Sequence, residues 1–148
     1  MTGADLSMMS RRTIAADAAR LFALWTEPDL LRRWWGPAGV VCPEASIDLR
    51  VGGRYRIGNL LPNGRTVWIE GEFLAIEPPR LLVYTWVVGT EPASQVSVRF
   101  EPRAAGTEIV VIHERIASAA VRDDHAAGWR GCLDGLAACA ETGAVKTA

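Results

Sequence analysis

The feature that most constrains the fold is a pair of tryptophans at the end of a predicted helix, followed at once by a Gly-Pro step: Trp34-Trp35-Gly36-Pro37. Glycine and proline together end a helix, because proline lacks a backbone N–H and glycine adopts conformations that other residues avoid. Further on, Gly52-Gly53 precedes an alternating strand pattern and predicts a positive φ or a bulge there. We interpret these six residues as a structural motif, since none is an obvious catalyst.

The composition indicates one folded domain with a mixed surface charge. The chain has 148 residues, of which 49% are hydrophobic, enough for a core and too many for a disordered chain. We expect a single domain over residues 7–143, with flexible ends at 1–6 and 144–148. The 16 Lys and Arg nearly balance the 17 Asp and Glu, so neither nucleic acid nor a membrane is expected as a partner.

The three cysteines, Cys42, Cys132 and Cys139, form no disulfide or metal-binding pattern. Cys132 and Cys139 lie on a predicted helix, about 10 Å apart along its axis, which is too far for a disulfide. No CxxC pair or Cys/His cluster predicts zinc, and no motif predicts another cofactor. No apolar stretch has the length of a signal peptide or membrane span, so we expect a reduced, cytoplasmic protein.

The first part of the chain predicts one strand and two short helices. Residues 8–14 are interpreted as the strand, and Asp17 as the N-cap of a helix over 18–25. Thr26 and Asp29 resemble a capping box for a second helix, over 28–35, which Gly36-Pro37 would stop.

The middle of the chain changes to a period of two, which is typical of strands. Pro62-Asn63-Gly64 predicts a hairpin with a type I′ turn, because Asn-Gly tolerates positive φ. Arg54, Arg56 and Glu70 are expected to point outward. The predicted strands cover residues 46–49, 54–57, 67–76, 81–88, 95–100 and 107–113.

The last element is a predicted helix over 123–141 that ends at Gly143. Trp129, Leu133, Leu136 and Ala140 recur at helical spacing and form one apolar stripe. Glycines within this helix are unfavourable by about 1 kcal/mol each relative to alanine. We therefore expect Gly128, Gly131 and Gly135 to let the helix lie close to a curved sheet.

These elements predict an α+β domain in which a curved antiparallel sheet of six to seven strands wraps around the long C-terminal helix, with two short helices after the first strand. Such a sheet leaves a cavity beneath the helix unless large side chains fill it. The Gln95–Phe100 segment alternates cleanly, and an edge strand beside it would support a homodimer; a monomer is the alternative.

Several motifs resemble the Aha1-like family, named after the activator of Hsp90 ATPase, in the START/Bet v 1-like (SRPBCC) superfamily. The resemblance covers about residues 10 to 140 and implies a helix-grip fold with an internal hydrophobic cavity. The superfamily includes lipid carriers, polyketide cyclases, hydroxylase subunits and chaperone regulators, so the fold does not fix the activity. The matching motifs are Phe22–Leu30, Arg33–Pro37, Asp48–Gly53, Gly71–Phe73, Glu77–Leu81, Tyr84–Trp86, Gly106-Thr107, Gly128-Trp129 and Leu133–Leu136.

Both histidines have a chemical and a structural interpretation. His113 with Glu114 would be a general base and its carboxylate, or else a polar pair at a strand end on the surface. Neighbouring strand residues point to opposite faces, which favours the structural interpretation. His125 follows two acids at a helix start and is expected to be a solvated first-turn residue.

The sequence best predicts a binding or carrier protein for an apolar or aromatic small molecule that enters between the last helix and residues 36–41. One alternative is a cyclase- or hydrolase-type enzyme with His113 or Tyr84 as acid/base. Another is an interaction protein that regulates an Hsp90-type chaperone or acts in a stress response. No catalytic or metal-binding residue is assigned. The expected cavity-lining residues are Trp68, Tyr84, Trp86, Val98, Ile109, Val111, His113, Trp129 and Leu133.

Overall fold

The computed structural model describes residues 6–146 as a sheet of seven strands, two short helices and one long helix. Most strands extend a few residues beyond their predicted bounds, and the strand over 81–88 has the bounds expected. In chain order the elements are β1 (Leu6–Ile14), α1 (Ala18–Thr26), α2 (Pro28–Leu31), β2 (Val41–Ile47), β3 (Arg54–Leu60), β4 (Thr66–Glu77), β5 (Leu81–Val88), β6 (Ser94–Arg103), β7 (Gly106–Ile116) and α3 (Ala119–Thr142).

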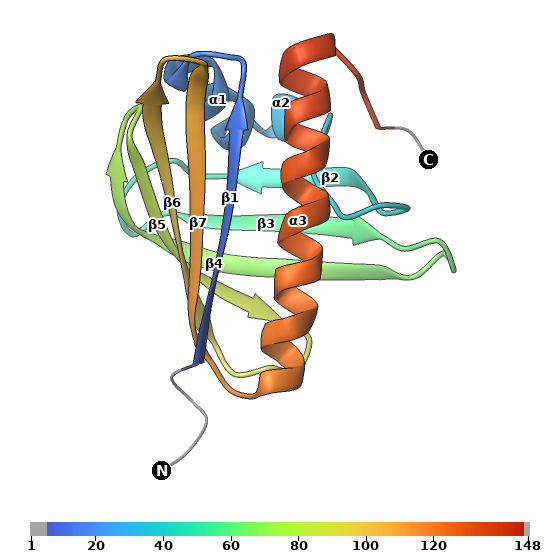
Figure 1. Ribbon diagram of the computed structural model, residues 1–148. Coiled ribbons are helices and arrows are strands. Elements are labelled where there is room, and N and C mark those ends of the chain that lie inside the picture. Colours follow the sequence, from blue (N-terminus) through green and yellow to red (C-terminus); the bar gives the residue numbers. More distant parts are fainter. Residues whose placement is uncertain (1–5, 147–148) are drawn as a thin grey trace.

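The strands form one antiparallel sheet in the order β1-β7-β6-β5-β4-β3-β2. The sheet curves around α3, and α1 and α2 close one end of the interior (Figure 1). This confirms the expected helix-grip architecture. The proposed dimer edge is wrong, because β6 lies between β5 and β7, and the edge strands are β1 and β2.

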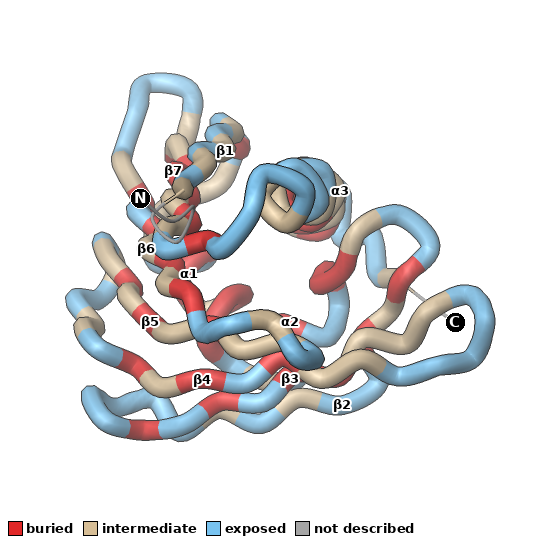
Figure 2. Tube along the Cα trace, turned by 90° about the horizontal axis from the view of Figure 1, so that it is seen from below, coloured by how far each residue is buried: buried red, intermediate tan, exposed pale blue. Residues whose placement is uncertain are grey.

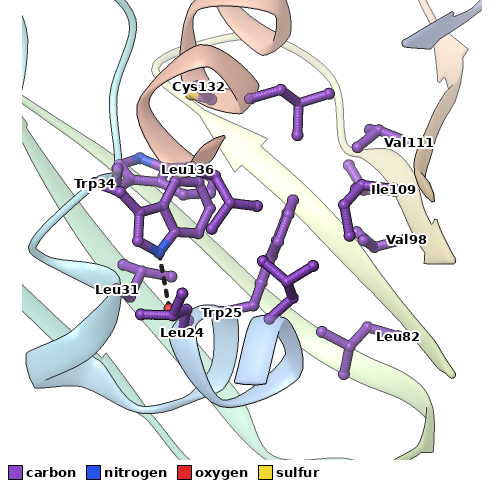
Figure 3. Close-up of a cluster of buried hydrophobic side chains, with 14 of the residues drawn as sticks. Leu24, Trp25, Leu31, Trp34, Leu82, Val98, Ile109, Val111, Cys132 and Leu136 are labelled. Carbon is purple, nitrogen blue, oxygen red and sulfur yellow. Dashed lines mark hydrogen bonds between the residues drawn. The ribbon is translucent and has the colours of Figure 1, made fainter. Parts of the chain in front are cut away.

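The second helix is shorter than predicted, and Thr26 is not its cap. Thr26 Oγ1 donates to the carbonyl of Phe22 at 2.8 Å, so Thr26 completes the last turn of α1 instead. The helix ends at Leu31, and the chain then turns so that Trp34 Nε1 donates to the carbonyl of Leu24 at 2.8 Å (Figure 3). This bond folds the double tryptophan back under α1, which is why a continuous helix to residue 35 does not form.

The loop that follows the double tryptophan is where α3 packs most closely. A Cβ on Gly131 would lie 2.9 Å from Pro37 Cα, and one on Gly135 would lie 2.7 Å from the carbonyl oxygen of Trp34. The expected close approach therefore exists, but it is to residues 34–37 and not to the sheet. A Cβ on Gly128 would have no neighbour within 4 Å, so this glycine serves no such contact.

The structure confirms the turn predicted at Gly52-Gly53 and changes the type of the turn predicted at residues 62–64. Gly52 has a φ of +83°, and a Cβ on Gly53 would lie 2.1 Å from the carbonyl oxygen of Asp48; the Gly-Gly step is therefore required by this tight turn. The hairpin at 62–64 forms, but it is not type I′, because Asn63 does not adopt positive φ. Its side chain instead accepts from the N–H of Arg65 at 2.9 Å.

Aromatic side chains fill most of the interior between the sheet and α3. Trp25 lies at the centre of this cluster: its ring centroid is 4.9 Å from that of Trp34, 5.9 Å from Phe100 and 6.0 Å from Trp129. Figure 3 shows Trp25 between side chains of the sheet and those of α3, and Figure 2 shows the exposed positions on the loops. A void of only about 20 Å³, beside Trp25 and Tyr84, is left here, which is room for about one water molecule.

Both ends of the described chain belong to the fold. Leu6 begins β1, and Lys146 Nζ donates to the carbonyls of Gly36 and Pro37 at 2.7 and 2.9 Å. The backbone N–H of Lys146 also donates to the carbonyl of Arg33. Leu6 and Lys146 lie outside the expected domain of residues 7–143, and flexibility at Leu6 and at residues 144–146 stays a prediction. The same expectation for residues 1–5 and 147–148 lies outside the described residues.

Candidate functional site

One pocket combines apolar walls with a polar rim, and it lies between the sheet and the N-terminal half of α3. Its volume is about 180 Å³, nine times that of the central void. Its lining residues are Trp35, Pro37, Asn59, Ile69, Trp86, Val88, Glu91, Asp124, His125, Gly128, Trp129 and Cys132.

Three tryptophans form the apolar wall of this pocket. The ring centroid of Trp129 is 5.6 Å from that of Trp35 and 5.4 Å from that of Trp86. The three rings come from the loop after α2, from β5 and from α3, and each is buried. Rings at these separations support one another as packed aromatic pairs, so the wall is rigid.

The rim carries the polar groups of the site. His125 Nε2 lies 3.2 Å from Glu91 Oε1, which connects α3 to the β5–β6 loop across the rim. Asn59 Oδ1 accepts from Trp35 Nε1 at 3.0 Å and so orients one ring of the wall. Asp124 precedes His125 on α3 and is exposed. The open space beside Gly128 is part of this pocket.

His113 supports the pocket from behind and is held as a neutral imidazole. Trp129 Nε1 donates to His113 Nδ1 at 3.1 Å, so Nδ1 is an acceptor without a proton. Nε2 must then carry the proton and donate to Ser94 Oγ, 2.7 Å away. Burial, with a smaller contribution from His125, lowers the pKa of His113 to about 3. Its ring stacks on that of His125, with centroids 4.4 Å apart.

This buried histidine predicts a loss of stability in acid. The unfolded chain binds a proton near the ordinary pKa of 6.5, whereas the folded chain does so only near 3. Between these values the unfolded state holds the extra proton, so stability falls as the pH falls, by about 1.4 kcal/mol per pH unit at most. Urea unfolding from neutral pH to pH 4 measures this slope. His113→Gln should show a shallower slope, and an equal slope in both proteins would contradict the assignment.

The predicted cavity-lining residues fall into separate groups. Trp86 and Trp129 line the pocket, and Tyr84 borders the central void. His113 touches Trp129 but is not part of the lining. The remaining members on β6, β7 and α3 are buried in the aromatic and aliphatic core and border neither space; these are Val98, Ile109, Val111 and Leu133.

Trp68 is a wrong prediction, because it lies on the outer face of the sheet. The guanidinium of Arg56 stacks over its ring at 3.6 Å, and Arg56 also pairs with Glu70 at 3.2 Å. Both charged residues point outward, as predicted. The inward positions of β4 are occupied instead by Ile69 and Phe73, which are buried.

The surface interpretation of the two histidines is also wrong. His113 is fully buried, and β7 continues past it to Ile116. The His125 side chain is only 12% exposed. The position of His125 could have been predicted from the sequence. It lies four residues before Trp129, about one helical turn, and so continues the apolar stripe of the last helix. Glu91 and Asn59 carry no such signal, since a loop and a strand end bring them to the pocket.

The residues suggested for acid/base chemistry are not arranged for it. Both ring nitrogens of His113 already have hydrogen-bond partners. Burial raises the pKa of the Tyr84 hydroxyl well above its ordinary value. The three cysteines are buried and free, and burial raises the pKa of Cys132 to about 12. Within residues 6–146 no group of His, Cys, Asp and Glu has the arrangement of a metal site.

A family model described as "Activator of Hsp90 ATPase homolog 1-like protein" matches residues 15–141. The chain belongs to this AHSA1 family. The match spans every residue that lines the pocket. Among curated proteins, none matches the sequence significantly.

Solved structures of other proteins show the same architecture. Protein CV1439 from Chromobacterium violaceum is 26% identical, with a TM-score of 0.84 over 91% of this chain and 96% of that one. The AHSA1 protein from Silicibacter pomeroyi is 24% identical, with a TM-score of 0.81 over 90% and 96% of the two chains. An AHSA1-like protein from Aeromonas hydrophila is 22% identical, with a TM-score of 0.76 over 88% of this chain and 89% of that one.

In the described part of this AHSA1-like chain, no helix is long and apolar enough to cross a membrane.

Proposed function

We propose that this protein binds a small, flat, largely apolar molecule in the pocket between β4, β5 and α3. The observation that carries the proposal is the rigid wall of Trp35, Trp86 and Trp129 next to a ring of polar groups. Ligand sites in proteins combine apolar and aromatic walls with a few polar groups that fix orientation. The AHSA1-like fold commonly hosts such sites.

One tryptophan of the wall has a buried donor without a partner in the described part of the chain. Trp86 is 7% exposed, and within residues 6–146 its Nε1 is the buried side-chain polar atom that has no hydrogen-bond partner. Leaving such a donor unpaired costs about 1–3 kcal/mol. Because this atom is buried, a bound molecule could accept its hydrogen bond only if the ring moved.

The size of the pocket limits the ligand to about one ring. A volume of about 180 Å³ compares with the roughly 150 Å³ of a cavity that binds benzene. A long lipid or a fused polycyclic molecule would require the rim to open. We therefore propose a single-ring or similarly compact ligand.

Gly128 allows a direct test of this site. Because its Cβ position points into open space in the pocket, Gly128→Leu should fill the site and weaken binding of benzyl alcohol by at least about tenfold, without strain on the fold. Titration followed by the 1H–15N signal of Trp86 Nε1 measures both affinity and location. Ala127→Leu is the matched control, because it adds the same side chain at an exposed neighbouring position. Equal binding by the two variants would contradict the proposed site.

Native mass spectrometry of gently purified protein separates the functional classes. A stoichiometric bound molecule would support a carrier and identify its chemical class. Conversion of that molecule would instead support an enzyme that uses the same pocket. Regulation of an Hsp90-type chaperone would need a surface interface, and this alternative stays a prediction that an ATPase stimulation assay tests.

A further inference from the structure

The charges around the pocket are all of one sign, and we propose that its ligand carries a cationic amine on a small aromatic or apolar body. This inference rests on the proposed function of the same pocket. Glu91 and Asp124 line it, and no Lys or Arg in the described part of the chain does. A ligand ammonium would therefore meet two carboxylates, and a ligand carboxylate or phosphate would be repelled by both.

Both carboxylates have capacity left for a ligand. Glu91 Oε1 contacts His125 Nε2 at 3.2 Å, which uses one of about four acceptor positions on that group. Asp124 forms no ion pair with any residue between 6 and 146, whereas its neighbour Asp123 lies 3.6 Å from Arg122. The acid that lines the pocket is thus without an ion-pair partner among these residues, and the acid beside it on the helix lies near an arginine.

The tryptophan wall favours the same sign of charge. Indole rings carry negative π faces, which attract cations and repel anions. The wall also excludes water from one side of the site, so the attraction between an ammonium and Glu91 is screened less than on an open surface. Wall and rim therefore select together for a positively charged group held against an apolar ring.

Three probes of nearly equal size test the inference: benzylamine, benzyl alcohol and benzoate, which are cationic, neutral and anionic near neutral pH. We expect benzylamine to bind at least about tenfold more tightly than benzoate in low salt, with benzyl alcohol between them, and this preference to shrink in high salt. Titrations followed by the Trp86 Nε1 signal place each probe in the pocket.

Charge-neutral variants assign the preference to named residues. Glu91→Gln and Asp124→Asn should each weaken benzylamine binding by about two- to fivefold, the range for a partly exposed ion pair, and change benzyl alcohol binding by a smaller factor. Asp123→Asn is the matched control and should alter neither. Because the first two variants keep nearly the same shape, a loss that is larger for benzylamine than for benzyl alcohol reports on charge.

The outcomes separate this inference from the proposed function. If benzyl alcohol binds in the pocket but benzoate binds as tightly as benzylamine, the preference for amines is wrong and the binding site stands. If Asp123→Asn weakens benzylamine as much as Asp124→Asn does, the amine does not sit in this pocket, and the inference is also overturned. If none of the three probes binds, both the inference and the proposed function are wrong.

Discussion

Replacing Trp129 with alanine is expected to lower the free energy of unfolding by about 3–5 kcal/mol. The side chain is 3% exposed and packs against Trp25, Trp35 and Trp86. Its removal leaves a large cavity at the centre of the contact between α3 and the sheet. It also removes the N–H that donates to His113 Nδ1. Urea unfolding at neutral pH, followed by circular dichroism, measures the loss.

Two further variants show whether the position, and not tryptophan in general, causes this loss. Trp68→Ala makes the same substitution on the outer face, where the side chain is partly exposed and stacks with Arg56. It should cost about 1 kcal/mol, the scale of an exposed cation–π contact. Trp129→Phe keeps much of the packing and should cost less than Trp129→Ala. A loss of under about 1 kcal/mol for Trp129→Ala would mean that α3 packs on another face.

Introducing leucine at Gly131 or Gly135 is expected to destabilise the protein by about 3 kcal/mol or more. This is the upper end of the free-energy cost of placing a larger side chain in a packed site. A Cβ at either position falls within 3 Å of backbone atoms of Pro37 or Trp34, and backbone cannot move aside as a flexible side chain can. The helix would have to separate from the loop at 34–37, which also carries the carbonyl contacts to Lys146. Thermal and urea unfolding measure the change.

Gly128 provides the internal control for that experiment. All three glycines lie in α3, so helix propensity alone predicts that leucine stabilises each of them by about 1 kcal/mol. Only at Gly128 does the surrounding structure leave open space. Gly128→Leu should therefore leave the free energy of unfolding unchanged or raise it. Equal destabilisation by all three substitutions would contradict the close contact with residues 34–37.

Local signals in the sequence were sufficient for the element order and for some boundaries. The predicted range of β5 is correct because Pro78-Pro79 precedes it and an apolar run interrupted only by Thr85 defines it. Gly143 ends α3 with a φ of +76°, as its position after the apolar stripe predicted. The second helix was overextended because no local rule anticipates the bond from Trp34 to the carbonyl of Leu24, which joins two separate segments.

The faces of the strands were harder to assign than the strands themselves. Alternation separates two faces but does not say which one is buried. On β4 the answer was available, because Trp68 shares its face with Glu70, which was already expected to point outward. On β6 and β7 the inward residues were chosen correctly, yet they pack in the core and do not border the pocket.

The sequence by itself determined the AHSA1 family and the helix-grip architecture, because these depend on the order of strands and helices and on motifs within single segments. Only the tertiary structure decided which residues form the pocket. Glu91 and His125 come from a loop and from α3, and they meet across a rim that exists only once the helix lies on the sheet. The same packing buries His113, fills the centre with indole rings and leaves a pocket beside Gly128.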